Sequence, residues 1–428
     1  MHIQTLTLTN YRGAQSLSLD LEERLNVFVG VNGAGKSTVL DAATILLSWV
    51  VSRIRTPGAS GRPISEDDIT NQQSSAAMEL TCVHGGKTIT WRLAKGRRGQ
   101  GTLSRPSSLT QLNDYTRQLQ VQIADPSLAA NLPLFVYYPV NRAVLDIPLR
   151  IRGKHTFDLL TAYDNALTTG ANFRTFFEWF REREDLENEI KVRNGQPSLF
   201  ESETAPEIPD PQLVAVRNAL YGVLPEFSNL TVRRNPLRME IEKQGQILTV
   251  NQLSDGEKCL IAMVSDLARR MAIANPAADN PLEGDGVVLI DEIDLHLHPK
   301  WQRRIVPKLL EVFPNCQFLV STHSPHVLTH VKPQNIFLLE WGAGNITAQK
   351  PSESYGKNVD RILEDLMGLE TTRPTQVSAE LHDVYTMIER NRLEEARQEI
   401  AHIKQEIGED PDLVRAEVLI KRKELIGQ

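Results

Sequence analysis

A glycine-rich segment near the start of the chain has the residue types and spacing of a phosphate-binding loop. Residues 30–37 read Gly-Val-Asn-Gly-Ala-Gly-Lys-Ser and fit the pattern G-x-x-x-x-G-K-[ST]. Glycines allow backbone N–H groups to converge on phosphate oxygens, and a helix N-terminus adds partial positive charge. Lys36 is expected to bind the β- and γ-phosphates, and Ser37 to bind Mg²⁺. The expected nucleotide-binding residues here are Gly30, Asn32, Gly33, Ala34, Gly35, Lys36, Ser37 and Thr38. The alternative is a glycine-rich turn without a ligand.

Two acidic residues follow a wholly apolar segment in the second half of the chain. Residues 287–290 read Val-Val-Leu-Ile and precede Asp291 and Glu292. An acidic pair at the carboxyl end of a buried strand lies where open α/β sheets bind their ligands. We therefore expect Asp291 to hold Mg²⁺ and Glu292 to orient and polarise an attacking water. The alternative is a strand that ends in solvated acids.

A histidine follows the next apolar segment. Residues 318–325 read Phe-Leu-Val-Ser-Thr-His-Ser-Pro, which predicts a strand that leads into a polar turn. His323 could bind the γ-phosphate and sense its loss, although a histidine at a strand end is often structural. The expected catalytic residues are thus Lys36, Glu292 and His323, and the expected metal ligands are Ser37 and Asp291. His296 and His298 have too few neighbouring ligands in sequence to favour a metal site over loop packing.

A predicted helix N-terminus is the last candidate for a phosphate contact. Residues 253–258 read Leu-Ser-Asp-Gly-Glu-Lys, and Ser254 with Glu257 forms a capping-box pattern before an apolar segment. A capped helix that presents a hydroxyl and the amide of Gly256 is also a site for an anion. Ser254, Gly256 and Glu257 are therefore expected to contact a nucleotide held by another subunit.

Strand-like and helix-like segments alternate around these motifs, as expected for an α/β fold. After residue 339 the chain is predicted to be helical and charged. Strands are predicted at 3–8, 17–21, 25–29, 78–82, 88–93, 134–138, 230–232, 238–242, 246–250, 287–290, 316–320 and 336–339. Helices are predicted at 36–54, 157–167, 173–192, 214–224, 260–274, 375–389 and 393–407.

Composition sets broad limits on function. The 428 residues include 47 basic and 54 acidic side chains, a net charge of −7, which excludes a globally basic nucleic-acid coat. Three widely spaced cysteines indicate neither a disulfide framework nor a zinc finger, so we expect a cytoplasmic protein. The most apolar segment, 42–51, is far shorter than the roughly 20 residues of a membrane-spanning helix, so no membrane partner is expected.

The order of these motifs resembles the ABC-type ATPase superfamily, in the branch of SMC, RecF and OLD-like proteins. The resemblance implies an α/β head: a mixed sheet with flanking helices and an N-terminal antiparallel β-subdomain. It also implies a head-to-tail homodimer with two ATP molecules, each held by one phosphate loop and by Ser254 and Gly256 of the other chain. Two positions depart from common patterns, because Asp255 replaces a glycine and His298 stands where transporters carry aspartate.

Two further contacts to the nucleotide follow from the same resemblance. Arg12 corresponds to an arginine that contacts phosphate in SMC-like heads, although it fits a solvated turn equally well. Residues 135–142 lie where relatives place a loop that senses Mg²⁺, but they contain no glutamine. Asn141 and Arg142 are the candidates within this segment.

The motifs also predict a domain organisation. Residues 1–150 and 225–345 are expected to form one split ATPase head. Residues 151–224 would be a helical insertion with a mobile linker at 194–211. Residues 346–428 would be a helical tail for oligomerisation or partner binding.

The tail carries a second resemblance, which is the closest that the sequence suggests. Segments 355–358, 362–368 and 373–374 resemble the region after the ATPase in the PtuA family of Septu anti-phage systems. This resemblance implies an oligomeric ATPase that hydrolyses ATP slowly and controls a small HNH endonuclease of the PtuB kind. A RecF-like DNA-repair ATPase and a nucleotide-binding structural hub with dispensable hydrolysis are the alternatives.

Clusters of basic residues are candidates for a nucleic-acid interface. They lie at 95–98, 150–154 and 233–234. Together they could bind duplex phosphates without sequence specificity. The alternative for each cluster is an ordinary solvated loop.

Overall fold

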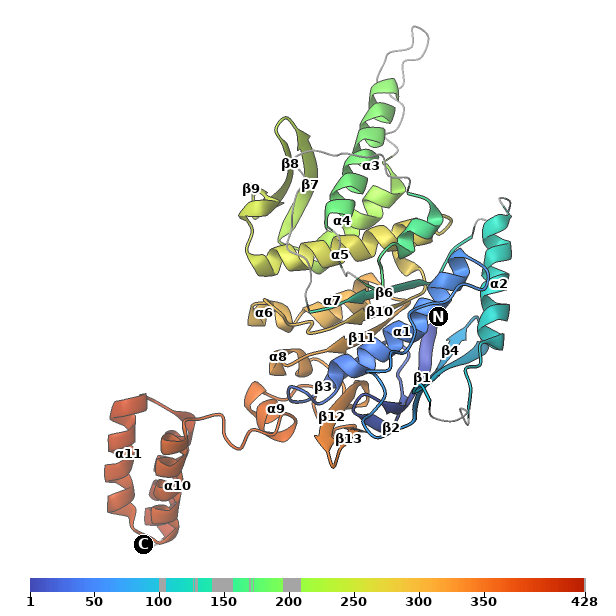
Figure 1. Ribbon diagram of the computed structural model, residues 1–428. Helices are drawn as coiled ribbons and strands as arrows, with labels where there is room; N and C mark the ends of the chain where they lie inside the picture. The colour runs from blue at the N-terminus through green and yellow to red at the C-terminus, as the bar shows by residue number, and fades with distance from the viewer. Residues whose placement is uncertain are drawn as a thin grey trace. The chain divides into compact units, whose positions relative to one another are not determined.

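The computed structural model describes residues 1–99, 105–125, 127, 130–140, 157–168, 171, 173–194 and 209–426. The chain forms two compact units, residues 1–357 and 358–428 (Figure 1). Each is described by itself below.

A six-stranded mixed sheet forms the centre of the first unit. Its order is β13-β12-β3-β11-β10-β6, and all neighbouring pairs are parallel except β12 with β13. Strands β3, β10 and β11 are buried along their whole length, as expected for apolar strands covered on both faces. The strands are β3 Leu25–Val29, β6 Leu134–Tyr138, β10 Gly286–Ile290, β11 Cys316–Ser321, β12 Ile336–Gly342 and β13 Asn345–Gln349.

Strand β13 corrects the prediction that the chain is helical after residue 339. Ala343 and Gly344 both have positive φ angles, of 50° and 79°. Two such residues form the tight turn whose twist matches a β-hairpin, so the chain folds back and pairs with β12. The sequence signal for this hairpin was the Ala-Gly-Asn segment that lies between the two short strands.

The N-terminal antiparallel sheet is present as predicted. Its order is β2-β1-β4-β5, and α2 (Thr110–Ala124), which the sequence did not predict, packs against β5. Leu112, Tyr115 and Leu119 fix this helix because they lie on one buried face. The strands are β1 His2–Tyr11, β2 Ala14–Asp20, β4 Ser75–His84 and β5 Lys87–Gly96. The predicted fold class, a mixed sheet with flanking helices and an antiparallel β-subdomain, is confirmed.

Helix α1 (Lys36–Arg55) follows the glycine-rich segment directly. It is the one helix among the described residues that is long and apolar enough to cross a membrane by length and composition. Thirteen of its 20 residues are buried within the fold, so the same features fit a core helix. Its apolar side chains pack beside the strands that carry the site.

A second layer surrounds α5 (Asp255–Ala274), which lies between the central sheet and a small antiparallel sheet (Figure 1). The predicted helix at 157–167 is wrong in extent, because only a 3-10 turn at Leu159–Tyr163 forms before Asn165 adopts a positive φ of 52°. The surrounding elements are α3 Phe173–Asn194, α4 Pro211–Val223, β7 Phe227–Arg234, β8 Leu237–Lys243 and β9 Gln246–Thr249. Short helices complete the unit: α6 Pro299–Gln302, α7 Ile305–Val312, α8 Pro325–Leu328, and 3-10 turns at Val250–Gln252, Pro281–Glu283 and Pro333–Asn335.

The second unit is helical. Helices α10 (Thr375–Glu389) and α11 (Leu393–Ile407) have the predicted limits, and they pack with α12 (Pro411–Ile426) around a core that includes Val384, Ile403 and Ala416. Arg373 braces this bundle through hydrogen bonds of 2.8–3.0 Å to Asp410 and Asp412. Helix α9 (Val359–Asp365) precedes the bundle.

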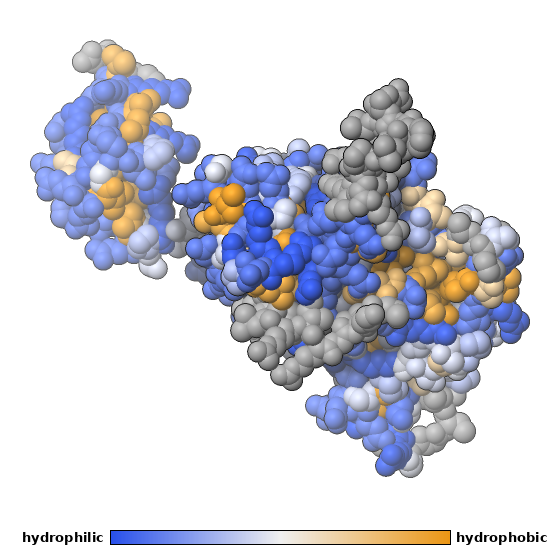
Figure 2. Space-filling view, turned by 90° about the horizontal axis from the view of Figure 1, so that it is seen from above, coloured by the Kyte–Doolittle hydropathy of each residue, from blue (hydrophilic) through white to orange (hydrophobic). Residues whose placement is uncertain are grey.

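The described surface is mainly polar in the view of Figure 2, and its apolar side chains gather in a few areas, the broadest of them at the right. Among the exposed aromatic side chains, Trp341 near the end of β12 is 52% exposed.

Candidate functional site

Three adjacent parallel strands bring the predicted motifs to one edge of the central sheet. Strand β11 lies between β3 and β10, and all three run in the same direction. The carboxyl ends of parallel strands meet at the same edge, where open α/β sheets bind ligands. The loops at 30–35, 291–294 and 322–324 therefore lie side by side, although almost 300 residues separate the first from the last.

Ser37 and Asp291 meet directly. The Ser37 hydroxyl donates a hydrogen bond of 2.8 Å to Oδ2 of Asp291, and the Ser321 hydroxyl donates to Oδ1 of the same carboxylate. Asp291 is 3% exposed, and its position is fixed further by a backbone hydrogen bond of 2.9 Å to Tyr138. The two predicted metal ligands thus form one preorganised pair. Ser321 was missed, and its only signal was its place at the end of an apolar strand.

Lys36 is held against the phosphate loop itself. Its Nζ donates hydrogen bonds of 2.8 Å to the carbonyl of Gly30 and 3.1 Å to that of Val31. Burial lowers the pKa of Lys36, and the nearby carboxylates of Asp291 and Glu292 act in the opposite direction. The ammonium group is therefore desolvated and ready to exchange two carbonyl partners for anionic phosphate oxygens.

Glu292 and His323 lie in the loops that follow β10 and β11. Glu292 has a positive φ of 48°, an uncommon conformation for a residue with a side chain, and its amide donates 2.8 Å to the Ser321 hydroxyl. The amide of His323 donates 3.3 Å to Asp294, a carboxylate that also accepts 2.5 Å from Thr322. Asp294 therefore ties the loop after β10 to the loop after β11. A strained residue held in place by its surroundings is a common feature of active sites.

The chemistry of this edge suits Mg²⁺ in a nucleotide complex. Magnesium binds one or two carboxylates or hydroxyls, together with phosphates and water, rather than a cage made entirely of protein. Ser37 and Asp291 supply such a pair. Within the described part of the chain, no group of three or more His, Cys, Asp or Glu side chains could hold a metal, which leaves His296 and His298 without a cluster.

The capping box at the start of α5 is confirmed. Ser254 accepts a hydrogen bond from the Glu257 amide, and the Glu257 carboxylate accepts one of 3.0 Å from the Ser254 amide. Lys243 binds Glu257 at 2.5 Å, and hydrogen bonding to Lys243 and Ser254 lowers the pKa of Glu257 although burial acts in the opposite direction. Asp255 is 80% exposed and pairs with Lys258, so its extra negative charge faces solvent.

The start of α5 opens onto a pocket of about 740 Å³ rather than onto the phosphate loop of its own chain. Among the described residues, no member of the segment 30–38 lines this pocket. The opposite wall is the loop after β10, where His298 caps α6 by accepting 3.2 Å from the Lys300 amide. The pocket residues include Lys243, Ser254, Gly256, Glu257, His296, His298, Lys300 and Trp301.

Gly256 fixes the spacing between these two walls. A Cβ added at Gly256 would overlap the carbonyl oxygen of His296, which is backbone and cannot rotate away. We expect Gly256→Ala to displace the loop that carries Glu292 and Asp294 and to reduce ATP turnover at least 10-fold. ATP binding to the phosphate loop should change by less than threefold, as measured by calorimetry beside a steady-state assay.

Gly342→Ala is the matched control for this prediction. A Cβ added at Gly342 would meet no atom within 4 Å. Turnover by this control should stay at the native rate. Equal turnover by Gly256→Ala and Gly342→Ala would contradict the packing argument.

Buried charges connect α5 to the strand next to Asp291. Asp266 is fully buried and binds Arg269 at 2.8 Å and Arg270 at 2.7 Å. It also accepts a hydrogen bond of 3.1 Å from Tyr138, the last residue of β6, whose carbonyl binds the Asp291 amide. The pKa of Asp266 is lowered by these two arginines against the effect of burial. The helix with the capping box is therefore linked to the carboxylate strand through paired charges.

The remaining predicted contacts are placed elsewhere or lie outside the described residues. Arg12 binds Asp41 at 2.5 Å and Asp68 at 2.9 Å, so in this structure its guanidinium pairs with carboxylates of its own chain. Asn141 and Arg142 lie outside the described residues, as does most of the predicted linker 194–211.

Carboxylates pair with both arginines of the basic cluster at 233–234 and with one arginine of the cluster at 95–98. Arg233 pairs with Glu240, and Arg234 with Glu184 and Asp185. In the cluster at 95–98, Arg97 donates to backbone carbonyls and Arg98 lies 3.6 Å from Glu66. The cluster at 150–154 lies outside the described residues.

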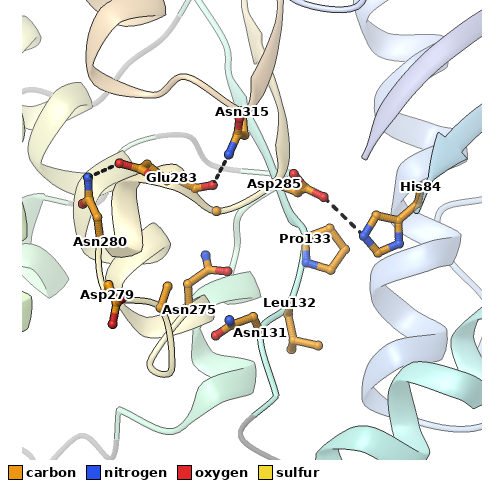
Figure 3. A pocket seen from close by; sticks show the side chains of 12 residues that line it. His84, Asn131, Leu132, Pro133, Asn275, Asp279, Asn280, Glu283, Asp285 and Asn315 are labelled. Atoms are coloured by element: carbon orange, nitrogen blue, oxygen red, sulfur yellow. Dashed lines mark hydrogen bonds and ion pairs between the residues drawn. The ribbon is translucent and has the colours of Figure 1, made fainter. Parts of the chain in front are cut away.

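A second pocket, of about 410 Å³, lies at the opposite edge of the sheet, where β6 and β10 begin (Figure 3). His84 lies 3.3 Å from Asp285, and the N-terminal ammonium of Met1 lies 2.8 Å from the same carboxylate. The hydrogen bond from His84 and the charge at Met1 hold the pKa of Asp285 well below its usual range. This pocket is thus separated by the length of the strands from the edge that carries Ser37 and Asp291.

Comparisons with known proteins agree with the geometry. A family model described as "AAA domain, putative AbiEii toxin, Type IV TA system" matches residues 25–329. The retron Ec83 probable ATPase of Escherichia coli is 31% identical, over 99% of this chain and 87% of its own length. The Septu protein PtuA of Bacillus thuringiensis is 23% identical, over 87% of this chain and 85% of its own.

The retron protein is thus more similar than PtuA, which corrects the expectation that PtuA is the nearest relative. Among solved structures, the SMC head domain from Thermotoga maritima covers 82% of this chain and 100% of its own, with a TM-score of 0.45 and 16% identity. The family model spans the phosphate loop, the carboxylate strand and the histidine turn, which are the segments that converge at the sheet edge. The chain belongs to this AAA-domain family of P-loop ATPases.

Proposed function

We propose that the protein binds and hydrolyses ATP with Mg²⁺ at the edge formed by β3, β10 and β11, and that ATP closes a head-to-tail dimer. One observation carries this proposal: the 2.8 Å hydrogen bond that joins the Ser37 hydroxyl to Asp291. A phosphate loop and a strand-end carboxylate held together in this way form the expected metal and phosphate site of a P-loop ATPase.

Each residue has a distinct task in the proposed reaction. Lys36 leaves the carbonyls of Gly30 and Val31 and binds the phosphates, while Ser37 and Asp291 hold Mg²⁺. Bound Mg²⁺ neutralises charge on the phosphate oxygens. Glu292 orients and polarises the attacking water, and its positive φ directs the chain sharply away from β10. His323 contacts the γ-phosphate.

The pocket at the start of α5 supports a site shared between two chains. It contains Ser254 and the capped N-terminus of the 20-residue helix α5, where the partial positive charge of the helix favours an anion. The phosphate loop of the same chain does not line it among the described residues. A second copy can therefore present its bound triphosphate to this pocket.

The wild-type protein tests this proposal directly. With ATP and Mg²⁺ we expect phosphate release at a slow, measurable rate and a shift to dimer or higher oligomer in light scattering. With ADP, or with ATP and EDTA, we expect neither. Hydrolysis that persists in EDTA would contradict the assigned metal site, and the same mass with ATP and ADP would contradict the shared site.

The relatives suggest the setting of this ATPase. One is named for a retron and one for Septu. We propose that the protein is the ATPase of a bacterial anti-phage complex and that its nucleotide state controls a partner effector. A small HNH endonuclease is the partner that the tail resemblance favours, and the helical unit 358–428 is the proposed contact.

A further inference from the structure

The hairpin of β12 and β13 exposes a large aromatic side chain close to the phosphate loop. Trp341 is 52% exposed, whereas Trp91 and Trp179 in the same unit are almost fully buried. The indole ring packs against Gly13, because a Cβ added there would overlap three of its ring atoms. Trp341 is therefore supported by the protein on one side and open to solvent on the other.

The same hairpin packs against the phosphate loop through both of its strands. A Cβ added at Gly30 would overlap the carbonyl oxygen of Leu339, and one added at Gly35 would overlap the side chain of Ile346. The Ile346 amide also donates a hydrogen bond of 3.1 Å to the carbonyl of Gly13. Both strands of the hairpin therefore lie in van der Waals contact with the phosphate loop.

Strand register places the indole beside this contact. Trp341 and Ile346 are directly opposite each other in the β12–β13 pair. Opposite residues of an antiparallel pair project from the same face, with Cβ atoms about 4.5–5.5 Å apart. Because Ile346 touches Gly35, Trp341 lies one side chain away from the N-terminus of α1, where the phosphates are proposed to bind.

We infer that Trp341 is the stacking surface for the base of the bound nucleotide. This inference rests on the proposed function, because the phosphate loop must hold the triphosphate for the base to reach the indole. Base–aromatic stacking tolerates every base, since each has a π-face. Trp341 therefore adds affinity for nucleoside triphosphates as a class and discriminates little between adenine and guanine.

The test compares ATP with inorganic tripolyphosphate, which has the phosphates but no base. By calorimetry, Trp341→Ala should weaken ATP binding roughly 10- to 100-fold and leave tripolyphosphate binding within twofold of native. Trp341→Phe should retain most of the ATP affinity. The control Tyr355→Ala removes another aromatic side chain, which is 63% exposed, and should leave the affinity for both ligands unchanged.

Fluorescence gives a readout that does not depend on lost affinity. The chain has five tryptophans, and ATP should quench emission in the native protein because the base covers Trp341. In Trp341→Phe this quenching should disappear although ATP still binds. Persistent quenching would overturn the inference.

Two further outcomes distinguish a failure of the stacking role from a failure of the proposed phosphate site. Equal losses of affinity for ATP and tripolyphosphate in Trp341→Ala would overturn the stacking role and assign Trp341 to the structure of the fold. A change of oligomeric state without a change in ATP affinity would also overturn it and assign Trp341 to contact with a second copy. If Lys36→Ala leaves tripolyphosphate binding intact, the proposed phosphate site itself is wrong. If Lys36→Ala loses tripolyphosphate binding while Trp341→Ala keeps full ATP affinity, the stacking role is rejected and the phosphate site stands.

Discussion

Lys36→Ala should reduce ATP affinity on the order of 100-fold and abolish ATP-dependent dimerisation. The native ammonium is desolvated and, among the described residues, donates hydrogen bonds to the carbonyls of Gly30 and Val31, so stronger charge-assisted interactions form when phosphates bind. Two charge-assisted hydrogen bonds of about 1.5 kcal/mol each account for this loss. Calorimetry and light scattering with ATP provide the two measurements.

The control for this prediction is Lys87→Ala, which removes an exposed lysine at the start of β5. It has the same change of charge and should bind ATP with native affinity. Thermal unfolding of both variants without nucleotide should show intact folds. Native affinity in Lys36→Ala would reject the phosphate loop as the binding site.

Glu292→Gln should have the largest effect on turnover. The substitution keeps the size of the side chain and removes the charge that polarises water, so we expect hydrolysis to fall roughly 10²- to 10⁴-fold. ATP binding should persist, and dimers should accumulate because the triphosphate is not consumed. Single-turnover assays and light scattering with ATP and Mg²⁺ measure the two effects together.

Glu311→Gln is the matched control, since Glu311 is exposed on α7 and binds only Lys308 among the described interactions. The same pair of variants tests the biological proposal in cells that also carry a gene for the proposed effector. Phage protection should change in Glu292→Gln and stay native in Glu311→Gln. Protection that is indifferent to both Lys36→Ala and Glu292→Gln would reject nucleotide control of the effector.

Sequence alone predicted the parts of the fold that depend on local periodicity. Strand 287–290 and helices 375–389 and 393–407 were recognisable because apolar spacing sets both the element and its limits. Strand β13 was not, because its identity depends on pairing with β12 after a two-residue turn. Helix α2 was missed because only four of its 15 side chains are buried, which leaves a weak apolar pattern in the sequence.

In the site, too, local sequence patterns could be recognised, whereas contacts between distant segments could not. The phosphate loop and the strand-end acids carry recognisable patterns, and the structure brings Ser37 and Asp291 together. Ser321 and Asp294 were not predicted to support them, because their roles arise from hydrogen bonds between loops that follow different strands. The contact of Trp341 with Gly13 could not be predicted from sequence either, since the two residues lie more than 300 positions apart.

The strand order of the central sheet also has a consequence for how the protein is made. Strand β3 at residues 25–29 pairs on both sides with strands that come after residue 315, and β6 pairs with β10 about 150 residues later. Contacts so distant in sequence slow folding, because the chain must close long loops before they form. On the ribosome, the first 285 residues therefore emerge without any completed strand pair of this sheet. The nascent chain would expose apolar strands for many seconds of synthesis, so we expect its yield to depend on chaperones more strongly than its final stability does.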